Sequence, residues 1–177
     1  SYTPVNSYFE STANLTPEAR AKACLGALTQ ARASNELKAA GFLVIGVSGS
    51  ARGNKAGMFA YRRNTSSNYT LTVRSNDGTG SGWAAGDHPD FAKLDTDRVA
   101  TRAIEKARNS RAPVAIEPGR YTVILEPQAV GDLVQLVSGY VDARSSDEGR
   151  SPFTKPGGGN KIGEKIVDSR VTLLSDP

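Results

Sequence analysis

Phe42-Leu43-Val44-Ile45-Gly46-Val47 is a continuous apolar run with the length of one β-strand. A glycine- and serine-rich stretch, Ser48 to Lys55, follows it and leads into a second apolar run, Met58 to Tyr61. A phosphate-binding loop is excluded because no Gly-Lys-Ser/Thr follows at the required spacing, so the two runs predict a hairpin or meander. Tyr69 to Val73 alternates apolar and polar residues, which indicates another strand with one buried face.

Two helices are predicted on either side of these strands. Thr16-Pro17-Glu18 begins the first, with a capping hydroxyl, a proline at the first helical position and an acid in the first turn. We expect its helical register to continue until Gly41. Asp95 is a plausible cap for the second helix, Thr96 to Ser110. Residues at helical spacing form its apolar side: Val99, Ala100, Ala103, Ile104 and Ala107.

The last third of the chain continues the mixture of strands and helices. Val114 to Glu117 and Tyr121 to Leu125 are predicted to be two strands around a tight turn. Pro127 opens a helix with an apolar stripe of Val130, Leu133, Val134, Val137 and Val141. A polar loop follows from Ser145, with Gly157 to Gly159 as a flexible connection and a β-like end at Val171 to Leu174. The order predicts an α+β fold of mixed sheets with flanking helices.

Composition narrows the classes of function. The chain has 22 Lys plus Arg against 18 Asp plus Glu, and only Arg62-Arg63 is an adjacent basic pair. Such scattered charge argues against direct nucleic-acid binding. The one cysteine, Cys24, cannot close an internal disulfide, which favours a cytoplasmic protein. No apolar stretch reaches the roughly 20 residues of a membrane span.

The chain has one histidine, His88, and this limits its metal and hydrolytic chemistry. A zinc site built from this chain alone would combine His88 with carboxylates. A Ser-His-Asp hydrolase would also have to use His88, but its neighbours Asp87 and Pro89 form no recognisable nucleophile pattern. A surface turn residue is the favoured interpretation of His88.

Three runs of the chain resemble the TldD/PmbA family, whose members have been called modulators of DNA gyrase and peptide-maturation proteases. They are Pro118 to Pro127, Asp147 to Ser151 and Gly163 to Pro177. The part from the Thr16 helix through the Thr96 helix is similar to the middle region of the family. Because family members are considerably longer, the resemblance implies a fragment of a larger two-domain protein. Residues 1–117 would be the middle region, and 118–177 the start of the C-terminal domain.

The resemblance also implies a place for the family's zinc chemistry. In TldD-like subunits a His-Glu-x-x-x-His motif lies on the helix after the Pro-Gly-x-Tyr-x-Val strand, whereas PmbA (TldE) subunits lack it. If Leu133-Val134 corresponds to the apolar pair ahead of the motif, its ligand and base positions fall on Gln135, Leu136 and Tyr140. These side chains are poor zinc donors and supply no general base. Gly139 would remain as an inherited kink.

The first hypothesis is therefore a PmbA/TldE-like, non-catalytic subunit of a cytoplasmic zinc metallopeptidase complex. This chain would hold no cofactor and be inactive alone, with zinc expected in a TldD-like catalytic partner and a peptide as substrate. Glu148 and Arg150 are the expected peptide- or partner-binding residues, with a solvated charged turn as the alternative. A second hypothesis, which the family's older name suggests, is a regulatory or binding module acting on DNA gyrase.

Overall fold

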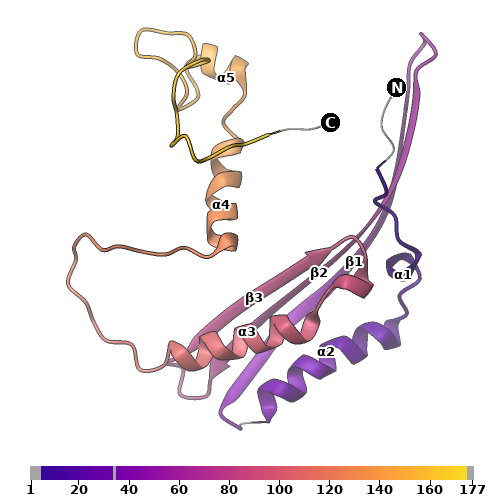
Figure 1. The fold of residues 1–177 in the computed structure, drawn as a ribbon, viewed down its shortest axis with the longest axis vertical. Helices are drawn as coiled ribbons and strands as arrows, with labels where there is room; N and C mark the ends of the chain where they lie inside the picture. Colours follow the sequence, from indigo (N-terminus) through magenta and orange to yellow (C-terminus); the bar gives the residue numbers. More distant parts are fainter. Residues whose placement is uncertain (1–4, 34, 175–177) are drawn as a thin grey trace. The chain divides into compact units, whose positions relative to one another are not determined.

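The computed structural model describes residues 5–33 and 35–174, which fall into two compact units, Ser1–Ile116 and Glu117–Pro177. The first unit contains, in chain order, α1 (Glu10–Ala13), α2 (Pro17–Arg32), β1 (Leu37–Gly53), β2 (Phe59–Ser75), β3 (Ser81–His88), the 3₁₀ turn η1 (Phe91–Lys93) and α3 (Thr96–Asn109) (Figure 1). The second contains α4 (Pro127–Ser138) and α5 (Ala143–Asp147). The predicted α+β class with flanking helices is confirmed.

The strands form one three-stranded sheet in the order β1-β2-β3, antiparallel throughout rather than mixed. β1 and β2 pair along their full length, from Leu37 opposite Ser75 to Gly53 opposite Phe59. β3 is shorter and pairs with β2 only between Ser67 and Arg74. Residues 46–66 therefore extend past β3 as a two-stranded ribbon, which we call the hairpin arm (Figure 1).

The core lies between one face of the sheet and the helices α2 and α3 (Figure 1). Tyr69, Leu71 and Val73 of β2 are almost fully buried there, as the alternating pattern predicts. All the residues expected on the apolar side of α3 are buried: Val99, Ala100, Ala103, Ile104 and Ala107. The predicted caps are also confirmed, since the Thr16 hydroxyl accepts from the amide of Ala19 and the Asp95 carboxylate accepts from the amide of Arg98.

Small residues allow α3 to lie directly on the backbone of the β2–β3 hairpin. A Cβ atom added to Gly82 would clash with the backbone of Ala103 and Ala107, and one added to Gly80 would clash with the carbonyl of Ala107. Ala103 and Ala107 are themselves completely buried. The helix and strand backbones thus approach each other closely, and side chains larger than those of glycine and alanine would prevent this approach.

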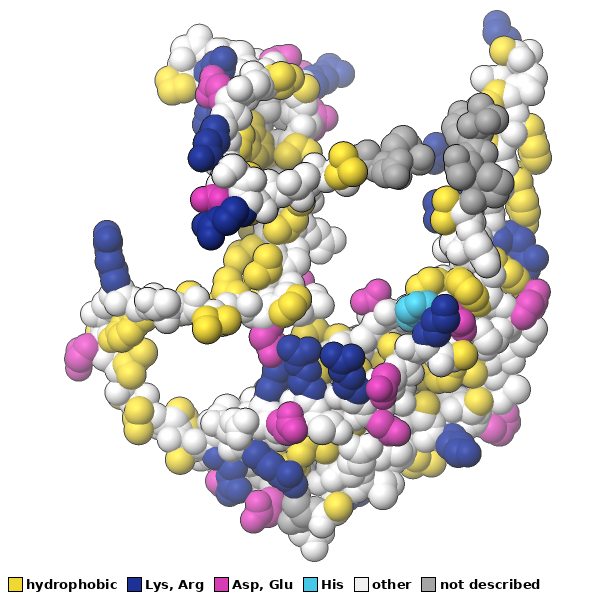
Figure 2. Space-filling view, in the orientation of Figure 1, with side chains coloured by type: hydrophobic (Ala, Val, Ile, Leu, Met, Phe, Trp, Pro, Cys, Tyr) yellow, Lys and Arg dark blue, Asp and Glu magenta, His cyan; other side chains and the backbone are white. Residues whose placement is uncertain are grey.

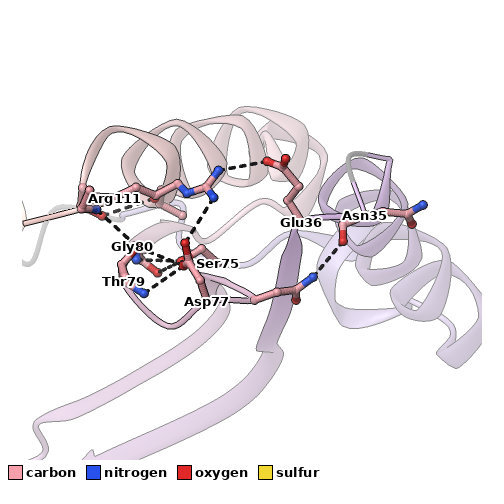
Figure 3. A network of polar contacts seen from close by, with 11 residues as sticks. Asn35, Glu36, Ser75, Asp77, Thr79, Gly80 and Arg111 are labelled. Atoms are coloured by element: carbon pink, nitrogen blue, oxygen red, sulfur yellow. Dashed lines mark hydrogen bonds and ion pairs between the residues drawn. The ribbon is translucent and has the colours of Figure 1, made fainter.

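A polar network joins three elements at the end of α3 (Figure 3). Arg111 pairs with Glu36, which precedes β1, and with Asp77 in the β2–β3 turn, at 3.0 and 3.2 Å. The same Asp77 carboxylate accepts hydrogen bonds from Ser75 and Thr79. These donors and the Arg111 guanidinium hold the pKa of Asp77 well below its ordinary value. The network thus connects the start of β1 and the β2–β3 turn to the C-terminal end of α3.

Several boundaries of helices and strands differ from those predicted from the sequence, because β1 and β2 are longer than expected. α2 ends at Arg32, and Asn35 has a positive φ of 51°, so the expected helical register up to Gly41 is wrong. The predicted hairpin is confirmed, but the Ser48 to Gly53 stretch belongs to β1 because β2 supplies a hydrogen-bonding partner for every residue. His88 is the last residue of β3 and is half-buried, so the predicted surface turn position is wrong.

The strands predicted after α3 are absent from the described residues. Val114 to Leu125 is irregular, with Ile124 97 % exposed, and Val171 to Leu174 forms no strand either. A strand needs a hydrogen-bonding neighbour, and neither run has one in the described residues. The helix begun by Pro127 is confirmed as α4, but its apolar stripe is largely exposed. The final residues of the Gly163 to Pro177 run, 175–177, lie outside the described part.

Gly157, Gly158 and Gly159 are not a featureless connection. All three have positive φ angles, between 83° and 106°, and they turn the chain between the bridged residues Thr154 and Asn160. Glycine adopts this conformation without steric cost. Separately, among the described residues no helix combines the length and apolar character needed to span a membrane.

Replacing Gly82 by Ala is expected to destabilise the first unit by about 2 kcal/mol, within the range typical of overpacked cores. The added methyl group would meet the α3 backbone, which cannot move aside as a flexible side chain can. Gly49→Ala in β1 is the matched control, because its nearest neighbour would be at an ordinary 3.5 Å. Urea unfolding followed by circular dichroism measures both. Equal stability of the two variants would contradict the close approach.

Replacing Asp77 by Asn is expected to lower the unfolding midpoint at neutral pH, because the ion pair with Arg111 is lost. A carboxyl with a lowered folded-state pKa stabilises the protein above its ordinary pKa of 3.8 and loses that effect as the pH falls further. The difference between wild type and Asp77→Asn should therefore shrink below pH 3.8. Thermal unfolding across pH checks this, and a constant difference would rule out the proposed linkage.

Candidate functional site

The helix α4 and the residues just after it carry the positions that the resemblance assigns to a zinc motif: Gln135, Leu136 and Tyr140. Pro127 occupies its first turn, where the missing amide hydrogen costs nothing, and Glu126 precedes it in an extended conformation. Gln135 and Leu136 lie in its last turn, and the helix ends at Ser138. Gly139 follows as the C-cap with a right-handed φ of −62°, and Tyr140 lies beyond the end. The positions therefore straddle a helix end rather than a kink at Gly139.

These side chains form no hydrogen-bonded cluster within the described residues. Leu136 is 63 % exposed and Tyr140 is 47 % exposed. The backbone carbonyl of Gln135 accepts from the amide of Gly139 and from the Ser138 hydroxyl, at 3.2 and 2.9 Å. These bonds satisfy the backbone at the end of the helix. The side chains of Gln135, Leu136 and Tyr140 form no set of metal-binding groups directed at one point.

The donor chemistry at these positions does not fit a zinc ion. Zinc in proteins is held by imidazole, thiolate or carboxylate groups, whereas Gln135, Leu136 and Tyr140 offer an amide, a hydrocarbon and a phenol. Elsewhere in the described residues, no group of three or more His, Cys, Asp or Glu side chains is placed to hold a metal ion.

His88 lies in the other unit, where it is the last residue of β3. Its Nδ1 accepts a hydrogen bond from the Asp90 amide at 2.8 Å, and its ring lies 6.5 Å from that of Phe9. The Ser67 hydroxyl donates to the backbone carbonyl of His88 rather than to the ring, and the Asp90 carboxylate accepts from Ser11. Because no serine hydroxyl bonds to this ring in the described structure, the geometry gives no support to a hydrolytic triad through His88.

Glu148 and Arg150 meet at the end of α5. Glu148 is paired with Arg150 and, at 2.9 Å, with Arg144 one helical turn earlier. These two guanidinium groups, first that of Arg150 and then that of Arg144, hold the pKa of Glu148 below its ordinary value. Both carboxylate oxygens are thus engaged, whereas Arg144 and Arg150 remain mostly exposed.

The backbone fixes this ion pair. Gly149 has a φ of 77°, its amide donates to Ser146, and the Arg150 amide donates to Ser145 at 2.8 Å. This is a Schellman helix end, in which a glycine in the left-handed conformation lets the chain satisfy the last carbonyls. The spacing of Glu148, Gly149 and Arg150 in the sequence therefore places the two charged side chains at a defined helix end rather than in a loose turn.

Sequence reasoning missed the polar cluster that surrounds this helix end. Asp142 caps α5 through the amide of Ser145, and Ser146 is buried, with its carbonyl accepting from the Thr154 hydroxyl. Asn160 donates to the Asp147 carboxylate at 2.8 Å. The signal was present as an Asp-x-x-Ser cap, Asp142 to Ser145, at the point where a polar loop was predicted to begin.

Comparisons with known proteins place this geometry in a family. Residues 11–111 match the PmbA/TldA metallopeptidase central domain, and residues 118–177 match the PmbA/TldA metallopeptidase C-terminal domain. Comparison with curated proteins gave no match.

The fold is similar to the crystal structure of a Thermotoga maritima protein described as a proposed modulator of a DNA gyrase. The TM-score is 0.81 at 16 % sequence identity, over 87 % of this chain and 37 % of the other. The chain thus spans little more than a third of the length of that protein. Since the two domain models together match most of the chain, it belongs to the PmbA/TldD metallopeptidase family.

Proposed function

We propose that the chain is part of a PmbA (TldE)-type, non-catalytic subunit of a metallopeptidase complex that matures or degrades peptides. The observation that carries the proposal is the chemistry at Gln135, Leu136 and Tyr140, which cannot hold zinc or act as a general base. These positions make a pseudo-active site. Zinc and the cleavage step belong to a TldD-like catalytic partner.

The exposed stripe of α4 supports a role in shaping the substrate channel. Val130, Leu133 and Val137 fall on one side of the helix and are 43, 54 and 42 % exposed. A helix without metal ligands still packs through such a stripe, and it forms a wall against which an extended peptide can lie. This assignment makes the subunit a structural part of the active complex rather than its chemical centre.

The helix end at α5 is the proposed contact for the peptide or the partner subunit. Glu148 is engaged on both oxygens, so it positions the guanidinium groups of Arg144 and Arg150. Arg150 is 64 % exposed at its side chain and can pair with an acidic group of the incoming molecule. We place the complex in the cytoplasm, in keeping with the free thiol of Cys24.

A second candidate is a regulatory module acting on DNA gyrase. The observation that favours it is the similarity to the Thermotoga maritima protein, which is described as such a modulator. A gyrase-binding role predicts that the complete protein retains gyrase in a pull-down. The metallopeptidase role predicts co-purification with a TldD-like subunit instead.

Metal content and peptidase activity of the complete protein test the first proposal. Alone, it should contain no stoichiometric zinc and cleave no peptide, because its motif helix lacks zinc donors. With a TldD-like subunit, it should co-purify and the complex should cleave peptides. Elemental analysis and a fluorogenic peptide assay measure both quantities. Stoichiometric zinc with peptidase activity in the lone protein would refute the proposal.

Arg150→Gln tests the contact assigned to the α5 end. Loss of an exposed charge-assisted hydrogen bond should weaken binding to the partner or peptide about tenfold. Arg120→Gln is the matched control, since it removes the same charge from an exposed residue in the irregular segment before α4. Titration calorimetry with the partner subunit and with substrate peptide measures the affinities. Equal affinities of the two variants would remove Arg150 from the interface.

A further inference from the structure

The β1–β2 hairpin carries the whole basic excess of the first unit. From Leu37 to Asn76 the chain has six Lys or Arg residues and no Asp or Glu, whereas the rest of that unit has nine of each sign. The carboxylates at its two ends, Glu36 and Asp77, are both paired with Arg111. Within the described residues, none of the six hairpin cations forms an ion pair.

One face of the sheet is left uncovered by the helices of its unit. The strand register places the even-numbered residues 38–52 of β1 and 60–74 of β2 beside the odd-numbered residues 81–87 of β3. We call this set the open face. The buried residues Tyr69, Leu71 and Val73 are on the opposite side, against α2 and α3. Neither α2 nor α3 packs on the open face, and a described side-chain contact to it is the hydrogen bond that Arg62 donates to the Ser7 hydroxyl at 3.4 Å.

The cations of the open face lie at its two ends. Lys38 is directly opposite Arg74 in the β1–β2 register, and like charges in that position destabilise a sheet. At the far end, Arg52 and Arg62 share the same face of the hairpin arm. Figure 2 shows basic and hydrophobic side chains, and no acidic ones, at the outer end of the hairpin arm. An anionic ligand would relieve the repulsion at both ends.

Aromatic and polar side chains lie between these ends, together with one exposed carboxylate, that of Asp87 on β3, opposite Asn68. Phe42 on β1 is 58 % exposed and Trp83 on β3 is 39 % exposed, one on each edge strand. The central strand places Asn68, Thr70 and Thr72 between them on the same face. The centre of a protein–protein interface is typically apolar, whereas here the exposed apolar side chains lie on the two edge strands and flank a central stripe of hydroxyl and amide groups on β2.

We propose that the open face binds single-stranded nucleic acid. Bases stack on Phe42 and Trp83, the polar stripe of β2 supplies hydrogen bonds, and the cations at the two ends contact phosphates. Stacking platforms inside a positive groove are the general means by which proteins hold single strands. Strand pairing thus places basic residues that are scattered along the sequence on one face of the sheet. The scattered charge therefore no longer argues against nucleic-acid binding.

Trp83 is the only tryptophan of the chain, so its fluorescence reports directly on the open face. Titrating the full 177-residue chain with oligothymidylate or oligouridylate should quench this fluorescence, with an affinity that falls as salt rises from about 50 to 200 mM. Phe42→Ala should weaken binding about fivefold or more, as removal of one stacked base does. Lys38→Gln with Arg74→Gln should flatten the salt dependence by about 0.7 in log–log slope for each phosphate that is no longer neutralised.

Lys22→Gln with Arg108→Gln is the matched control, because it removes the same charge from α2 and α3. It should leave the salt slope unchanged, and circular dichroism should give the same fold for every variant. Absence of quenching at the lowest salt would overturn the proposal, as would an equal decrease of affinity in the control. Equal binding and quenching by polyglutamate would replace nucleic acid with an acidic polypeptide.

Discussion

The close approach of α3 to the β2–β3 hairpin is the constraint on which the first unit depends. Gly80 and Gly82 have no side chain, and Ala103 and Ala107 present only methyl groups, so helix and strand backbones come into direct contact. This contact fixes which face of the sheet is covered. With this face covered, Tyr69 is buried, and Arg111 at the end of α3 lies within reach of Asp77.

Because α2 and α3 cover one face of the sheet, only the other face is available for binding. The sheet alternates its side chains, so the same strands that bury Leu71 and Val73 present Thr70, Thr72 and Arg74 on the opposite side. In the first unit, four of the six hairpin cations and the exposed rings of Phe42 and Trp83 are on that uncovered side. In the second unit the exposed stripe of α4 has the corresponding role in the proposed peptidase complex. Both proposals rest on surfaces that the described residues do not bury.

Several parts of the structure could be predicted from short-range patterns. Caps at Thr16 and Asp95, the proline that begins α4 and the spacing of the α3 apolar residues all act within one or two helical turns, where local chemistry decides the outcome. The strand boundaries could not be predicted in this way. Ser48 to Gly53 is extended because it pairs with β2. Val114 to Leu125 is irregular because no strand among the described residues pairs with it.

The sequence by itself determined the starts of α2, α3 and α4, the core side of α3, the family resemblance and the absence of zinc donors at Gln135, Leu136 and Tyr140, since each depends only on residue type and spacing. The tertiary structure alone decided the length of the hairpin arm, the pairing of Glu148 with Arg150 across a left-handed glycine, and the gathering of Lys38, Arg52, Arg62 and Arg74 on one face. Residues far apart in the chain become neighbours only through strand register and backbone turns, and local patterns do not encode that register.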